Sequence, residues 1–301
     1  MASSASQLSH VGEAAIEVLE RQHWLDSVAS GLQKAVTGAF EAGGDMGRRI
    51  RDVLHGTWLG HPLHPVLTDI PLGAWTTALV LDAAATERNG LSHAADAAIG
   101  IGLVGAAGAA VTGLTDWQHT TDDDRRVGLT HGLLNIGATA LYITALGLRR
   151  GGARDTGRLL AGAGFVVTMA AAYIGGHLVF RKRLGVDHAE RPGAWEDFVA
   201  VLREDALEEG QPRRVETHGV SIALVRRHGR VYAIGDRCAH LGGPLSEGAM
   251  EGDAALRCPW HGSVFALDDG RVLEGPSTYP QPCFETRVRA GQIEVRPRES
   301  C

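Results

Sequence analysis

Apolar residues divide the chain into three parts with different periodicities. Residues 1–55 are mostly polar, and their apolar positions recur at helical spacing, which predicts an amphipathic helical arm. After residue 197 apolar and polar residues come in short runs such as Val220–Val225, with a turn at His228–Gly229, which is typical of a small all-β domain. Between these two parts lie four long apolar stretches, roughly 66–86, 95–115, 128–148 and 159–180.

The four apolar stretches are long enough to cross a bilayer, which needs roughly 20 residues. Residues 128–148 contain no Asp, Glu or Lys, and residues 159–180 contain no charge at all. The first stretch is weaker because it contains Asp69 and Asp82. Abundant Gly and Ala are expected where membrane helices approach each other closely. We predict transmembrane helices, and a soluble Ala/Gly-rich four-helix bundle is the alternative.

The sequence therefore predicts a multidomain protein, with an all-α four-helix transmembrane bundle followed by a small all-β domain. The expected boundaries are a helical arm at 1–55, a membrane domain at 56–182, a polar linker at 183–196 and the β domain at 197–297. Eight Arg or Lys residues flank the spans on the side of the termini and five on the other side, which favours termini in the cytoplasm.

Composition indicates which kinds of partner and which redox compartment the protein can have. The formal net charge is −6, and the chain has no basic tail and no Lys/Arg-rich run of the kind that binds nucleic acid, so we expect no nucleic-acid partner. The chain has four cysteines, and its first fifty residues lack the short apolar core of a signal peptide. We therefore expect reduced thiols and a cytoplasmic metal site rather than disulfides.

Two short motifs in the β region carry the metal chemistry. CAHLGG at 238–243 and CPWHGS at 258–263 together read C-x-H, seventeen residues, C-x-x-H. Two thiolates and two imidazoles at such spacings could bind tetrahedral zinc. Both pairs, however, lie in Gly- and Pro-containing loops between predicted strands, whereas zinc fingers place their ligands on knuckles and a short helix.

The region around these motifs resembles the Rieske ferredoxins over about a hundred residues. The resemblance rests on YAIGDRCAHLGGPLSEG, LRCPWHGSVFALDDGRVLEGP and ETRVRAGQIEVRP. It implies a [2Fe–2S] cluster, with Cys238 and Cys258 on one iron and His240 and His261 on the other.

Five further residues are expected around the cluster from the same resemblance. High-potential relatives join the two loops through a disulfide, and Gly243 and Trp260 stand at those positions here. Phe265 replaces a tyrosine that bonds a ligand sulfur, and Ser263 could donate to a bridging sulfide. Together they predict a low-to-intermediate reduction potential. Pro276 resembles the loop that shields the cluster, with a simple turn as the alternative.

The apolar part resembles an uncharacterised bacterial four-helix membrane family through GHPLHPVLTDIPLGAW (60–75), THGLLN (130–135) and GGHLVFRKRLGV. Alternating span directions would place its ionisable residues at one membrane face. These could ligate haem b, with His131 and His177 as the favoured pair, could bind a quinone, or could only hold helices together. The expected pocket residues are His61, His64, Asp69, His131 and His177.

These features predict a membrane-tethered Rieske-type electron carrier in a bacterial inner membrane, with its β domain on the cytoplasmic side. It would be an oxidoreductase component rather than a self-contained catalyst. Its partners would be membrane lipid, electron donor and acceptor proteins, or a quinone. A redox or iron sensor without turnover is the alternative.

Overall fold

The computed structural model describes residues 4–86, 90–193 and 195–298. The described residues form two compact units. One contains residues within 1–44 and 63–184, and the other contains residues within 45–62 and 185–301.

Helices occupy the first part of the chain, and strands the last. The described residues contain seven helices, rather than only the four of a bundle, because the polar arm itself forms three. Three of the seven, α5 to α7, are long and apolar enough to cross a membrane, whereas α4 is not among them. The helices are α1 Ser4–Glu20, α2 Leu25–Ala42, α3 Gly44–His55, α4 Leu63–Ala84, α5 Leu91–Trp117, α6 Asp122–Arg150 and α7 Arg154–Phe180.

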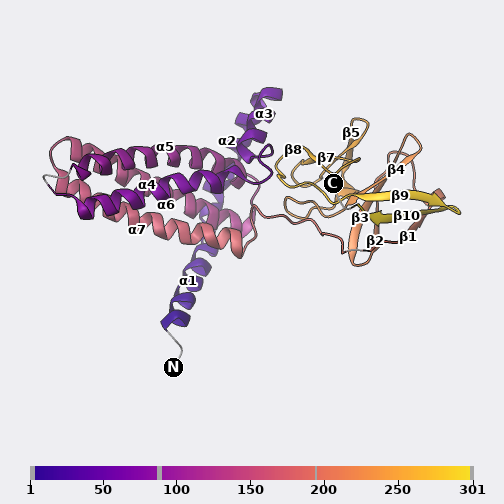
Figure 1. The fold of residues 1–301 in the computed structure, drawn as a ribbon, viewed down its shortest axis with the longest axis horizontal. Helices are drawn as coiled ribbons and strands as arrows, with labels where there is room; N and C mark the ends of the chain where they lie inside the picture. The colour runs from indigo at the N-terminus through magenta and orange to yellow at the C-terminus, as the bar shows by residue number, and fades with distance from the viewer. Residues whose placement is uncertain (1–3, 87–89, 194, 299–301) are drawn as a thin grey trace. The chain divides into compact units, whose positions relative to one another are not determined.

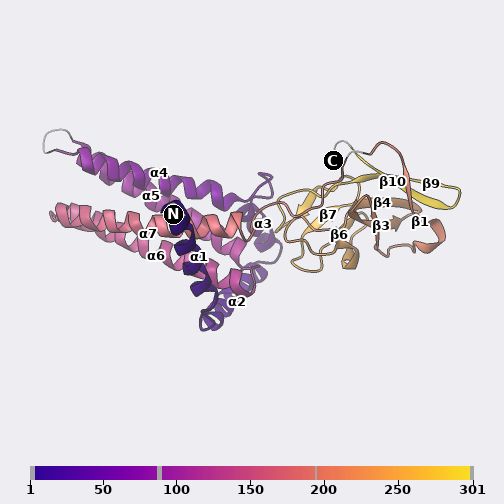
Figure 2. The same cartoon turned by 90° about the horizontal axis from the view of Figure 1, so that it is seen from below.

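Helices α4 to α7 run side by side as two helical hairpins, α4–α5 and α6–α7 (Figures 1 and 2). Trp75 of α4 and Tyr142 of α6 stack between them with ring centroids 4.0 Å apart, and both are buried. A Cβ added to Gly102 of α5 would lie 2.2 Å from Nε1 of Trp75, and one on Gly164 of α7 would lie 3.1 Å from Tyr142. Each aromatic ring thus packs on a glycine of its own hairpin, so the two hairpins are built alike.

Ion pairs join the hairpins at the end where α4 and α6 terminate. The Arg149 side chain is fully buried and pairs with Asp82 and, at 3.1 Å, with Asp96. Arg154 pairs with Asp96 at 2.8 Å, and Arg158 lies 3.6 Å from Asp82. A buried guanidinium needs such compensation, since removing one partner of a buried pair costs about 3–5 kcal/mol.

The arm helix α2 packs at the opposite end of the bundle. Leu25 and Ala29 are buried against Trp117 of α5. Asp26 accepts a hydrogen bond of 2.9 Å from Arg126, and this bond is the main reason why the pKa of Asp26 falls to about 2. The amphipathic pattern of the arm therefore serves docking of α2 onto α5 and α6.

The β unit contains three antiparallel sheets, with strand orders β1-β10-β9, β2-β3-β4 and β5-β6-β7-β8. The predicted turn at His228–Gly229 joins β3 to β4, and both residues have positive φ, as a tight two-residue hairpin turn requires. The strands are β1 Val199–Arg203, β2 Arg213–Thr217, β3 Val220–Arg227, β4 Arg230–Gly235, β5 Ala249–Glu251, β6 Ala255–Arg257, β7 Val264–Ala266, β8 Val272–Glu274, β9 Phe284–Arg289 and β10 Gln292–Pro297.

Residues 45–62, which include most of α3, pack with the β unit rather than with the helices that follow them in sequence. Arg51 pairs with Glu274 at 2.9 Å, and the N–H of Gly275 donates to Asp52 at 3.0 Å. A segment far away in sequence therefore braces the end of β8, a contact that the boundary expected at residue 55 did not include.

The glycine that supports Trp75 provides a test of the hairpin packing. We expect Gly102→Ala to destabilise the detergent-solubilised protein by about 1–3 kcal/mol, because the new methyl group would overlap the indole ring. Gly100→Ala on the same helix is the matched control, since an added Cβ there meets nothing within 4 Å. Thermal unfolding measures both, and equal melting temperatures would contradict this packing.

Candidate metal centre

The two predicted motifs form two loops with the same hydrogen-bonding pattern. One follows β4 and the other follows β6. The N–H of Cys238 donates to the carbonyl of Gly243 at 2.8 Å, and the N–H of Cys258 donates to that of Ser263 at 2.8 Å. Gly242 and Gly262 donate back to the cysteine carbonyls, at 2.8 and 3.2 Å, and both have φ +80. These glycines permit the tight return of each loop, because other residues rarely adopt that conformation.

The two cysteines are buried, free and hydrogen-bonded to each other. The bond from Cys238 is the main cause that lowers the pKa of Cys258 to about 7, and the same bond together with burial raises the pKa of Cys238. Backbone N–H groups of Trp260 and His261 also point at the sulfur of Cys258. The loop backbone and the neighbouring thiol therefore favour negative charge on the sulfur of Cys258, whereas Cys238 holds its proton more tightly.

The two histidines form a second pair. The rings of His240 and His261 lie 4.9 Å apart at 85°, and both residues are half-buried. Desolvation lowers the pKa of His261, which favours the neutral imidazole that a metal binds. No three His, Cys, Asp or Glu side chains in the described part of the chain gather around one ion. Two sulfur donors in one pair and two nitrogen donors in another suit a centre with two metals.

The predicted surrounding residues lie in or beside these loops. Ser263 is buried and its Oγ accepts a 2.9 Å hydrogen bond from the N–H of Ser277, which leaves its own proton free to donate. A Cβ added to Gly243 would lie 3.1 Å from the Cys258 sulfur and 2.9 Å from the ring of Trp260. Phe265 is fully buried, and Pro276 directly precedes Ser277. The sequence did not reveal Ser277, because its backbone rather than its side chain makes the contact.

Comparison with known proteins identifies the β unit. A protein-family model described as "Rieske [2Fe-2S] domain" matches residues 197–285. The ferredoxin subunit of the 3-phenylpropionate/cinnamic acid dioxygenase of Escherichia coli strain K12 is 41% identical over 87 residues, which cover 29% of this chain and 81% of that protein. The chain belongs to the Rieske [2Fe–2S] family. A Rieske domain implies a [2Fe–2S] cluster, and the two paired donor sets fit it.

Other relatives match the same part of the chain. Human apoptosis-inducing factor 3 is 33% identical over 98 residues, covering 33% of this chain and 16% of that protein. The solved structure of the ferredoxin of carbazole 1,9a-dioxygenase from Nocardioides aromaticivorans IC177 is 27% identical and covers 34% of this chain and 100% of that chain, with a TM-score of 0.33.

A second family model, described as "Predicted membrane protein (DUF2231)", matches residues 60–188. The chain is thus a fusion of a DUF2231 membrane domain and a Rieske domain, which confirms the two resemblances seen in the sequence.

The residues predicted to form a pocket in the helical unit do not all meet. His64 and His131 lie together, with ring centroids 6.3 Å apart. Asp69 is exposed, and His61 belongs to the other unit. The ring of His131 packs on Gly175 of α7, two residues before His177. Because each helical residue turns by about 100°, His177 points to a different side of α7, so the structure pairs His131 with His64 instead.

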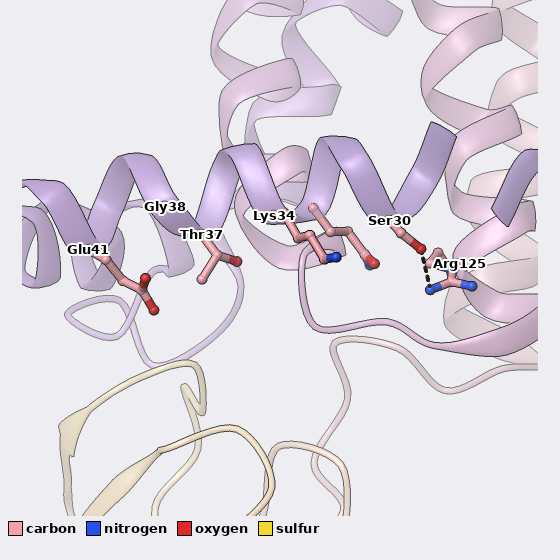
Figure 3. Close-up of a pocket in the computed structure, with 7 residues that line it drawn as sticks. Ser30, Lys34, Thr37, Gly38, Glu41 and Arg125 are labelled. Carbon is pink, nitrogen blue, oxygen red and sulfur yellow. Dashed lines mark hydrogen bonds between the residues drawn. The ribbon is translucent and has the colours of Figure 1, made fainter. Parts of the chain in front are cut away.

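A shallow pocket lies on the arm rather than at these histidines (Figure 3). It runs along one side of α2 past Ser30, Thr37 and Glu41, and Arg125 lies beside Ser30 with a hydrogen bond of 3.2 Å. None of the residues predicted from the sequence lines this pocket.

The expectation of reduced thiols is wrong for one cysteine outside the metal loops. Cys283 is disulfide-bonded, whereas Cys238 and Cys258 are free. Cys301 lies outside the described residues. Cys283 packs in the same buried cluster as Cys238 and Cys258, whose thiols remain free.

The Ser263 hydroxyl provides a test of the second coordination shell. Ser263→Ala should lower the midpoint potential of the cluster on the order of 60–100 mV, because a hydrogen bond to a charged group is worth about 1.5–2 kcal/mol. Thr286→Ala is the control, since its hydroxyl donates to Val231 O in the same domain. Redox titration followed by EPR measures both variants, and an unchanged midpoint in Ser263→Ala would rule out this hydrogen bond.

Proposed function

We propose that the protein is a membrane-tethered Rieske-type electron carrier in which Cys238 and Cys258 hold one iron and His240 and His261 hold the other. The observation that carries this proposal is the pair of equivalent loops, which present two buried sulfurs to each other and two imidazoles 4.9 Å apart. When bound, the cluster supplies reversible one-electron transfer.

The residues around the loops favour a low-to-intermediate potential. Phe265 offers no hydroxyl to a ligand sulfur, and Gly243 and Trp260 leave the two loops without a disulfide. Ser263 is the one buried residue with a hydroxyl group among the predicted residues. Pro276 is also buried and directly precedes Ser277, whose N–H donates to Ser263. Ser263 and Pro276 would therefore both shield the cluster. Hydrogen bonds donated to the cluster and ligand sulfurs raise the reduction potential, so a site with fewer such donors has a lower potential.

We further propose that residues 56–182 form a four-helix membrane domain that includes α4. Large apolar side chains face outward on all four helices, as Val80, Val104, Ile136 and Val166 show with exposed fractions of 62%, 76%, 65% and 68%. Such surfaces are rare on soluble proteins but stable in lipid. The distribution of flanking Arg and Lys favours a bacterial inner membrane with the Rieske domain, residues 197–297, on the cytoplasmic side after the linker at 183–196.

The electron would come from a quinol or an NAD(P)H-driven reductase, and would leave to a protein acceptor. The names of the relatives, ferredoxin subunits of dioxygenases, support an oxygenase-type acceptor. A quinone or haem bound in the helical unit is the other candidate for exchange with the cluster, in the region of the predicted His64 and His131. One electron enters and the same electron leaves, so the chain is an electron-transfer component with no substrate chemistry of its own.

Metal analysis tests the cluster assignment directly. Purified protein should contain two irons and two acid-labile sulfides per chain, as a [2Fe–2S] cluster requires, and His261→Ala should lose both. His228→Ala is the matched control, because this histidine lies in the exposed β3–β4 turn. Zinc in place of iron, or a normal cluster in His261→Ala, would contradict the proposal.

Reduction kinetics separate a carrier from a sensor. Membranes containing the protein should show rapid reduction of the cluster by a quinol analogue or by an NAD(P)H-driven reductase, followed by at least stoichiometric passage to an acceptor. A cluster that is intact but exchanges electrons with neither donor would exclude the carrier and favour a redox or iron sensor.

A further inference from the structure

His64 of α4 and His131 of α6 occupy equivalent positions in the two hairpins. Each lies eleven residues before the aromatic residue of its own helix, Trp75 or Tyr142. Those aromatics stack on one another, and the rings of the two histidines also lie together, with centroids 6.3 Å apart. Both pairs therefore lie where the two hairpins meet, so the internal repeat of the bundle places one imidazole on each side of that boundary.

Each ring is held by its own hairpin in the same way. Nδ1 of His64 lies 2.8 Å from the carbonyl of Ala109 on α5, and Nδ1 of His131 lies 2.8 Å from the carbonyl of Ala171 on α7. Because a carbonyl only accepts, both Nδ1 atoms must donate, so each neutral ring keeps its lone pair on Nε2. A metal-binding histidine is normally oriented by such a bond from its other nitrogen.

A glycine lies against the ring of each histidine. A Cβ on Gly113 of α5 would lie 2.8 Å from the His64 ring, and one on Gly175 of α7 would lie 3.0 Å from the His131 ring. A side chain at either position would press against the ring and require it to shift. Both hairpins therefore contain the same three parts: a histidine, the carbonyl that accepts a hydrogen bond from its Nδ1, and the glycine that makes room for its ring.

The separation of the two rings suits one metal between them. A metal–nitrogen bond of about 2 Å on each side, with each ring centre about 1 Å behind its nitrogen, requires centroids about 6 Å apart. The observed rings are 6.3 Å apart at 88°. Nδ2 of Asn135 lies 3.2 Å from Nε2 of His131 and also donates to the His131 carbonyl at 2.9 Å. A metal bound to Nε2 of His131 would replace only the 3.2 Å contact, and the shorter bond to the carbonyl would remain.

We propose that His64 and His131 are the two axial ligands of a b-type haem held between the hairpins. A bare ion would need further ligands, and no third His, Cys, Asp or Glu joins them among the described residues. A porphyrin brings its own four nitrogens, so two imidazoles on facing helices complete the iron. This proposal deepens the electron-carrier function and rests on it, since a haem would give the chain a second one-electron centre.

The test uses full-length protein, expressed with a haem precursor and purified in detergent. The wild type should show a sharp Soret band and close to one haem per chain by haemochrome assay. His64→Ala and His131→Ala should each lower the haem content about tenfold or more, since even outer-shell partners change metal affinity on that scale. His61→Ala, in the same sequence motif, and His177→Ala should retain haem.

Two further variants guard against simple misfolding. His131→Met keeps a possible iron ligand, so haem should remain with a shifted spectrum. Gly175→Ala should lose haem because its methyl group would displace the His131 ring, whereas Gly137→Ala, whose added Cβ meets nothing within 4 Å, should not.

The outcomes separate this inference from the proposed function. A wild-type protein with an intact cluster but no haem would overturn the haem site and leave the carrier standing. Haem lost in His177→Ala but kept in His64→Ala would also overturn the assignment. Haem present without any iron–sulfur cluster would support the haem site and overturn the carrier.

Discussion

Backbone N–H groups directed at two buried sulfur atoms are the interaction on which the Rieske domain depends. The N–H groups of His240 and Leu241 point at Cys238, and those of Trp260 and His261 point at Cys258. Thiolates buried without such donors would be costly, since an unpaired charge in a protein interior is strongly disfavoured. The short strands and glycine turns on either side of the loops hold the backbone that supplies these donors. The fixed loop backbone, rather than charged side chains, therefore supplies the donors to the two sulfurs.

In the helical unit, buried charged and polar groups are stabilised by other side chains. Its polar residues gather where the two hairpins meet, with the histidine pair toward one end and the Arg149 ion pairs toward the other. Between them Trp75 stacks on Tyr142. Ionisable groups within a membrane domain are stable only when they pair or serve a site. The repeat of hairpins achieves this pairing, because each hairpin offers one member of every pair.

Much of the fold could be predicted from the sequence, because the periodicity of apolar residues is a local property. The predicted stretch 159–180 lies inside α7 and the predicted turn at His228–Gly229 joins two strands. What sequence could not show is that residues 45–62 pack with the β unit. Asp52 accepts its hydrogen bond from Gly275, more than two hundred residues away, and no local pattern encodes such a partner. The disulfide at Cys283 was also not expected from the sequence.

The sequence by itself determined the family, because two Cys and two His at fixed spacing in glycine loops carry the Rieske resemblance that the family model confirms. It also identified the three apolar stretches in α5, α6 and α7 that are long enough to cross a membrane, whereas the fourth predicted span, in α4, is not among them. Only the tertiary structure decided which histidines meet in the bundle. His131 and His177 are close along neighbouring helices, yet the helical rotation between Gly175 and His177 turns the latter away and leaves His64 opposite His131. Pairing across two hairpins depends on the rotation of every helix about its own axis, and that rotation is set by packing rather than by any one segment.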